Sequence, residues 1–190
     1  MLDVLDKGKG AVVIIGIETT DGNSGEPLMY NESTLFIRGS GGFGGPKDRQ
    51  SPADAAAVAK IDIPNRAPDY VVKEKTSEDQ AALYRLSGDY NPLHIDPEMS
   101  KMGGFDVPIL HGLCSFGIGV KHVFRKICNS DSFAVKSVKA RFVKHVFPGE
   151  TLETAMWRDG GRVMFQVRVV ERNEVAVVGA VELAQLKSKL

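Results

Sequence analysis

One apolar segment near the middle of the chain, residues 109–127, constrains the fold more than any other feature. Its apolar residues recur at helical spacing, which predicts a helix with one buried face. One face of this helix lacks side chains at three glycines, Gly112, Gly117 and Gly119, although glycine lowers helix stability. We therefore expect a central helix whose backbone packs closely against a sheet.

The strands of that sheet are predicted on both sides of the helix. The expected strands are residues 70–75, 133–146, 151–158, 162–171 and 174–186. The last four are separated by the turn sequences Pro148-Gly149, Asp159-Gly160-Gly161 and Arg172-Asn173, which are hairpin signals. A long helix followed by antiparallel strands indicates the α+β class, with the sheet wrapped on the helix. Residues 70–190 are therefore expected to form one complete domain.

The N-terminal part of the chain predicts less. Residues 11–18 form an apolar, β-branched run, and residues 28–38 return as the second strand of a hairpin. The glycine-rich run 39–45 lacks the Gly-Lys-Ser/Thr ending and the following helix of a phosphate loop, so it is expected to be a flexible connector or a tight backbone passage. Residues 46–69 are polar and proline-marked, and are expected to be a linker. A hairpin alone is too small to bury a core.

Composition excludes some classes of function. Apolar residues make up 43% of the chain, as in ordinary globular proteins, and 24 basic residues balance 24 acidic ones. A net charge of zero gives no reason to expect wholesale binding to nucleic acid or to an anionic membrane. Cys114 and Cys128 lie in one apolar region and are expected to be reduced, buried thiols.

The residues with the clearest chemistry follow a predicted helix, residues 76–86, which Ser77 and Gln80 would cap. Asp89, Asn91 and His94 then lie on one short, proline-stiffened loop. A carboxylate and an imidazole this close suggest acid–base chemistry on a small substrate. A metal site lacks a second histidine or cysteine at ligand spacing nearby. A structural turn, in which Asp89 and Asn91 bond their own backbone, is the other alternative.

A second candidate is the pair His111-Gly112 at the start of the central helix. The amide of Gly112 would lie in the first helical turn, where amides lack internal partners and the helix dipole favours negative charge. With no side chain there, a substrate oxygen could approach closely, as an oxyanion-stabilising donor requires. Ordinary packing of the helix against the sheet explains the same residues equally well.

These motifs resemble a known family. Residues 82–97, ALYRLSGDYNPLHIDP, resemble the signature of the R-specific 2-enoyl-CoA hydratases (hydratase 2) of the MaoC-like hot-dog family. The likeness extends to residues 108–114 (PILHGLC), 139–142 (KARF), 5–10 (LDKGKG) and the glycine-rich run 39–45. Several separate motifs in the same order make the resemblance specific.

The resemblance implies a hot-dog fold, in which an antiparallel sheet wraps a long central helix. It implies two such repeats: a complete catalytic second repeat at residues 70–190, and at residues 1–45 a remnant that resembles only the last strands of a truncated first repeat. It also implies the reaction, which is reversible addition of water to a trans-2-enoyl-CoA to give the (3R)-3-hydroxyacyl-CoA. No metal, flavin or nicotinamide is then required, because coenzyme A is part of the substrate.

The resemblance further assigns roles to residues. Asp89 and His94 would be the catalytic pair, Asn91 would orient them, and the Gly112 amide would bind the thioester oxygen. The residues expected to line the substrate site are Lys7, Asp89, Tyr90, Asn91, Pro92, Leu93, His94, Gly112 and Phe142.

The last three residues, Ser188-Lys189-Leu190, match the peroxisomal targeting tripeptide. They predict a peroxisomal location and the import receptor as a partner. The substrate that the resemblance implies is an acyl-CoA, and the expected assembly is a homodimer. Neither nucleic acid nor a membrane is expected as a partner. Two alternatives stay open: a non-catalytic acyl-CoA-binding or interaction module left by truncation, and a thioesterase on the same fold.

Overall fold

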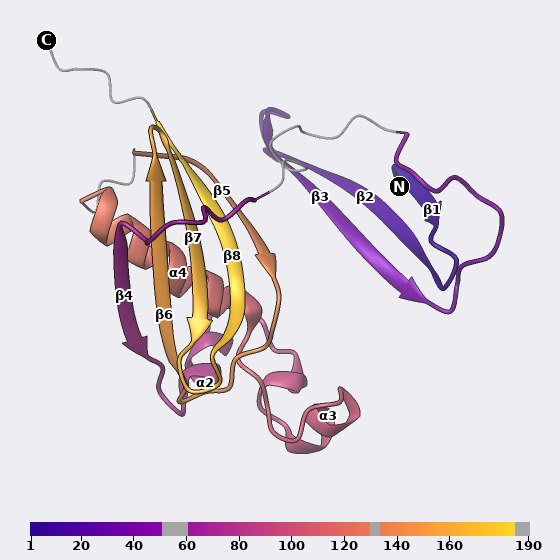
Figure 1. The fold of residues 1–190 in the computed structure, drawn as a ribbon. Coiled ribbons are helices and arrows are strands. Elements are labelled where there is room, and N and C mark those ends of the chain that lie inside the picture. Colours follow the sequence, from indigo (N-terminus) through magenta and orange to yellow (C-terminus); the bar gives the residue numbers. More distant parts are fainter. Residues whose placement is uncertain (51–60, 130–133, 185–190) are drawn as a thin grey trace, which may run out of the picture. The chain divides into compact units, whose positions relative to one another are not determined.

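The computed structural model describes residues 1–50, 61–129 and 134–184, and the chain divides into two compact units, Met1–Ala59 and Lys60–Leu190. Figure 1 traces the elements of each unit in sequence colours. No helix in these described ranges is long and apolar enough to cross a bilayer.

The first unit is a three-stranded antiparallel sheet of order β1-β2-β3 (Figure 1). Its strands are β1 (Asp3–Asp6), β2 (Gly10–Thr20) and β3 (Pro27–Arg38). The predicted hairpin is therefore confirmed as β2 and β3. Sequence reasoning missed β1, because four residues with an aspartate at each end carry little strand signal. This strand pairs with the start of β2, and Leu5 is buried there.

The glycine-rich run wraps around the side chain of Asp6. The Asp6 carboxylate accepts hydrogen bonds from the amides of Gly8 (2.9 Å), Gly42 (2.8 Å) and Gly44 (2.7 Å). The bonds from Gly42, Gly8 and Gly44 lower the pKa of Asp6. A Cβ atom on Gly41 would lie 2.3 Å from the Gly8 carbonyl oxygen. The run is thus a tight backbone passage whose amides bind a carboxylate of the chain itself.

The second unit contains a five-stranded antiparallel sheet of order β4-β6-β7-β8-β5. Its strands are β4 (Tyr70–Lys75), β5 (Val135–Phe142), β6 (Thr151–Asp159), β7 (Arg162–Val169) and β8 (Glu174–Leu183). The hairpins β6–β7 and β7–β8 are confirmed. The hairpin expected at Pro148-Gly149 is wrong, because β5 pairs with β8 instead of β6. A hairpin needs a short connection, and the eight residues between β5 and β6 lead to the opposite side of the β7–β8 pair.

The helices of this unit are α2 (Gln80–Arg85), the 3₁₀ turn η1 (Pro92–His94), α3 (Pro97–Met102) and α4 (Gly112–Ile127). The α+β class is confirmed, with α4 lying along one face of the sheet (Figure 1). The expected capping box is wrong, because α2 begins at Gln80 and its N-cap is Asp79, without a side-chain cap bond.

Close packing of α4 on the sheet depends on Gly119. A Cβ atom there would lie 2.6 Å from Val167 Cγ2 and 3.1 Å from the Phe165 ring. At Gly112 it would lie 3.2 Å from the Phe142 ring. Gly117 differs, since a Cβ atom there would meet nothing within 4 Å in the described structure. The expectation of close packing is therefore right for two of the three glycines.

A buried histidine ties the second half of α4 to two strands. His122 is 4% exposed; its Nδ1 lies 2.8 Å from Thr154 Oγ1 and its Nε2 lies 3.1 Å from Glu74 Oε2. Lys121 also binds Glu74, at 2.6 Å. Burial lowers the pKa of His122. The same helix buries Cys114, and Cys128 is buried at its C-cap, so the prediction of two buried thiols is confirmed.

The sheet face opposite α4 is covered by residues 61–69, which Figure 1 shows running across the strands. Trp157 Nε1 donates to the Arg66 carbonyl oxygen at 2.9 Å, and the Asp69 amide donates to the Met156 carbonyl oxygen at 2.8 Å. Trp157 is buried by this contact. This part of the segment expected to be a linker therefore packs on the second unit.

We expect Gly119→Ala to lower the free energy of unfolding by about 1–3 kcal/mol, because the new methyl group overpacks the contact with Val167. Gly117→Ala is the matched control on the same helix. It should raise stability by about 0.4–1 kcal/mol, because alanine loses less backbone entropy in open space. Urea denaturation of both variants measures the difference. Equal effects of the two substitutions would contradict the close approach of α4 to β7.

Candidate functional site

The loop after α2 is held in shape by its own backbone and by one arginine. Asp89 Oδ1 accepts from the Asn91 amide at 3.2 Å, and Asn91 Oδ1 accepts from the Leu93 amide at 3.1 Å. Arg85 Nη1 donates to the Tyr90 carbonyl oxygen at 3.0 Å, and its guanidinium lies over the Tyr90 ring. The backbone bonds expected of a structural turn therefore exist. They fix the positions of side chains that remain exposed, Asp89 among them.

His94 ends this loop and is oriented by a backbone carbonyl. The side chain is 9% exposed, and its Nδ1 lies 2.8 Å from the Ile109 carbonyl oxygen. A carbonyl oxygen only accepts, so Nδ1 carries the hydrogen in the neutral ring and Nε2 carries the lone pair. His94 is thus prepared to accept a proton at Nε2.

The fold brings a second imidazole beside His94. Asp89, His94 and His111 each have one side-chain atom that could bind a metal ion, and these three atoms lie within 4.8 Å of one another. The rings of His94 and His111 stack at 3.8 Å between centroids, with 28° between their planes. His111 is 1% exposed, and its Nε2 lies 3.3 Å from the Asp89 carbonyl oxygen. The sequence predicts no second histidine near the loop, and this is wrong, because the fold brings His111 from another segment next to His94.

Among the residues that the structure describes, these three form the group that could hold a metal ion. Coordination requires the in-plane lone pairs of the imidazoles to converge on one point. In stacked rings only 28° from parallel, the lone pairs lie in two nearly parallel planes, which does not favour convergence on one point. The arrangement therefore favours proton transfer over metal ligation.

Gly112 is the first residue of α4, and His111 is its N-cap. The Gly112 amide consequently lies in the first turn, where helix amides lack intrahelical partners. The residue is exposed, and the Phe142 ring lies beside it. His111, which directly precedes Gly112, contacts both the His94 ring and the Asp89 carbonyl oxygen.

The remaining predicted site residues fall into three groups. Tyr90 and Phe142 have exposed rings in the second unit, and Pro92 and Leu93 form η1 with His94. Lys7 lies in the first unit, where its ammonium contacts the Lys47 carbonyl oxygen and Asp48, so its part in the site stays a prediction. Ser188, Lys189 and Leu190 lie outside the described residues.

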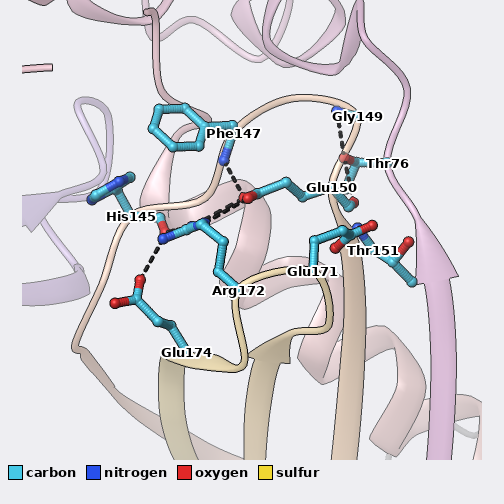
Figure 2. Close-up of polar contacts among 9 residues, drawn as sticks. All are labelled: Thr76, His145, Phe147, Gly149, Glu150, Thr151, Glu171, Arg172 and Glu174. Atoms are coloured by element: carbon cyan, nitrogen blue, oxygen red, sulfur yellow. Dashed lines mark hydrogen bonds and ion pairs between the residues drawn. The ribbon is translucent and has the colours of Figure 1, made fainter. Parts of the chain in front are cut away.

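The segment before α4 is bonded to the connection between β5 and β6, and a polar network holds that connection (Figure 2). The Leu110 amide donates to the Val146 carbonyl oxygen at 2.7 Å. The connection that carries Val146 is fixed by Arg172, whose Nε donates to Glu150 at 2.6 Å and whose Nη2 donates to the His145 carbonyl oxygen at 2.8 Å.

Glu150 completes this network. It accepts from the Phe147 amide at 2.7 Å, while Arg172 also contacts Glu174 and lies over the Phe147 ring (Figure 2). The carbonyl that orients His94 belongs to Ile109, one residue before Leu110. The position of His94 Nε2 therefore depends on a polar network that no spacing rule in the sequence reveals.

We expect Arg172→Met to lower the free energy of unfolding by about 1–3 kcal/mol, because it leaves half-buried Glu150 without its charged partner. Arg66→Met is the matched control, since Arg66 pairs with Asp69 at an exposed position. That change should cost less than Arg172→Met, because an ion pair at an exposed position contributes little. Urea denaturation compares the two. An Arg172→Met cost no larger than that of Arg66→Met would contradict the anchoring role of the network.

Comparison with known proteins gives consistent matches over both units. Residues 60–180 match the family model described as the MaoC like domain, and residues 1–39 match the MFE-2 hydratase 2 N-terminal domain. The peroxisomal hydratase-dehydrogenase-epimerase of Neurospora crassa is 53% identical over 181 residues, which are 95% of this chain and 19% of that protein.

Two further relatives are similar over nearly the whole chain. The peroxisomal enoyl-CoA hydratase 2 of Arabidopsis thaliana is 45% identical over 97% of this chain and 60% of its own length. The solved structure of full-length peroxisomal multifunctional enzyme type 2 from Drosophila melanogaster matches with a TM-score of 0.80 and 44% identity, over 96% of this chain and 32% of that one. The chain thus spans 60% or less of each of these three relatives.

Proposed function

Because this chain belongs to the MaoC-like domain family and has its hot-dog fold, we propose that it adds water to a trans-2-enoyl-CoA and forms the (3R)-3-hydroxyacyl-CoA. The observation that carries the proposal is the pairing of Asp89 with His94, whose Nδ1 bond to Ile109 leaves Nε2 as the proton acceptor. The hydratase names of the Arabidopsis and Neurospora relatives support it.

In this proposal, Asp89 and His94 hold the attacking water between them. The water oxygen adds to C3 of the enoyl chain while the pair accepts one of its protons. The pair returns one proton to C2, so it ends in its starting state and the net change is the addition of one water molecule. Because both side chains lie on one side of the substrate, the hydroxyl and the proton arrive on the same face. General acid–base assistance of this kind contributes about 10²- to 10⁴-fold to the rate.

The Gly112 amide has the complementary role. When water adds to C3, negative charge collects on the thioester oxygen, and a fixed donor at that oxygen stabilises the transition state more than the ground state. An amide in the first turn of α4 also carries the favourable end of the helix dipole. Asn91 would act by shaping the loop that holds Asp89.

The wider context is part of the same proposal. Acyl-CoA is the substrate, the peroxisome is the location and its import receptor is a partner through Ser188-Lys189-Leu190. The names of three relatives, each 45–53% identical, place those proteins in the peroxisome. Lys7 as a substrate contact and the homodimer belong to the proposal as well.

We expect Asp89→Asn and His94→Ala each to lower kcat by about 10²- to 10⁴-fold, because each removes one proton-transfer group. Loss of absorbance of the conjugated thioester, with crotonyl-CoA or decenoyl-CoA as the substrate, measures the rate. Glu98→Gln on α3 is the control, since it removes an exposed carboxylate that the mechanism does not use.

Three results would overturn the proposal in different ways. Wild-type rates in both site variants would exclude the Asp89–His94 pair as the catalyst. Tight acyl-CoA binding without turnover, measured by calorimetry, would identify a binding module. Release of free CoA thiol would identify a thioesterase.

A further inference from the structure

One buried side chain contacts every part of the site, although no step of the proposed hydration uses it. His111 stacks on His94 at 3.8 Å and its Nε2 lies 3.3 Å from the Asp89 carbonyl oxygen. It is also the N-cap of α4 and is joined by its peptide bond to Gly112. The Tyr84 ring packs against it at 4.6 Å. One imidazole therefore links His94, the loop that carries Asp89 and the proposed oxyanion donor.

We propose that His111 is a positioning residue, which sets the ring plane of His94 and the position of the Asp89 backbone relative to the Gly112 amide. This inference rests on the proposed hydration. Its two contacts are separable: the flat ring fixes the plane of His94, and the Nε2 hydrogen fixes the backbone of Asp89.

Packing alone does not account for an imidazole at this position. His111 is 1% exposed, and its Nδ1 has no hydrogen-bond partner among the described residues. Burying a polar atom without a partner costs stability, and a phenylalanine would fill similar space without that cost. The contribution that phenylalanine lacks is the Nε2 donor. Since the Asp89 carbonyl oxygen only accepts, the Nε2 hydrogen must be present in the neutral ring.

Charge around His111 is consistent with this role. The charged and titratable groups facing it are Arg85 and Tyr84 from α2, Asp89 from the loop and His94 from η1. Burial, followed by the neighbouring His94, lowers the pKa of His111. A lowered pKa favours the neutral form of His111, so the ring stacked on His94 carries no charge of its own.

A pair of substitutions separates the two contacts. His111→Gln keeps an amide donor near the position of Nε2 and loses the stacked ring, whereas His111→Phe keeps a stacked ring and loses the donor. His122→Gln is the matched control, because His122 is an equally buried histidine on the same helix that does not contact the site. His111→Gln and His122→Gln should lose thermal stability.

We expect kcat to fall by about 10- to 100-fold in at least one His111 variant, with KM within about twofold of the wild type, because a small misplacement of reacting groups costs rate more than binding. His122→Gln should keep the wild-type kcat below its unfolding temperature. Wild-type kcat in both His111 variants would overturn the inference.

An NMR measurement on the wild-type chain tests whether the His94 and His111 rings stack, even if a variant fails to fold. The chain has four histidines, so four imidazole C2 protons can be followed with pH. The His94 signal should show a ring-current displacement, while the His111 signal stays at its neutral position near pH 6.5. A His111 signal that titrates like that of an exposed histidine would also overturn the inference. Absence of turnover in the wild type would instead count against the proposed function, and the NMR result would still stand.

Discussion

The hydrogen bond between His94 Nδ1 and the Ile109 carbonyl oxygen is the interaction on which the site depends. It joins the loop after α2 to the segment that leads into α4. Because Gly112 lies only three residues after Ile109, the proposed base and the proposed oxyanion donor share one short stretch of backbone. The bond also selects the tautomer of His94, so the same contact sets the position of the ring and which nitrogen carries the lone pair.

That stretch of backbone is itself fixed by the sheet. Leu110 bonds to Val146 in the connection between β5 and β6, and Arg172 and Glu150 hold this connection in place. On the other side, Gly119 allows α4 to approach β7 closely enough for the helix to begin where the site needs it. The sheet therefore acts as the rigid support, and the loop that carries Asp89 adds the exposed chemical groups.

Local patterns in the sequence predict part of this arrangement well. The strand patterns and the turn sequences between them predict β4 and the β6–β7–β8 hairpins. The DYNPLH motif predicts that Asp89 and His94 lie together. Contacts between segments that are distant in the sequence leave no local pattern. Nothing near Pro148 indicates that β5 pairs with β8, and no spacing rule predicts that a carbonyl fifteen residues later orients His94. The sequence indicates His111 only as the neighbour of Gly112, because ring stacking between separate segments leaves no pattern in the sequence.

In the proposed reaction, Asp89 and His94 act together on one face of the substrate. Hydration of a trans-2-enoyl-CoA in D₂O tests this most directly, because the configuration of the product records where both new bonds formed. The expected product is the (3R)-3-hydroxyacyl-CoA with deuterium at C2 on the same face as the new hydroxyl group. Deuterium on the face opposite the new hydroxyl group would contradict the claim, because groups on one side of the substrate cannot form both bonds in that way. A (3S) product would contradict the proposed R-specificity.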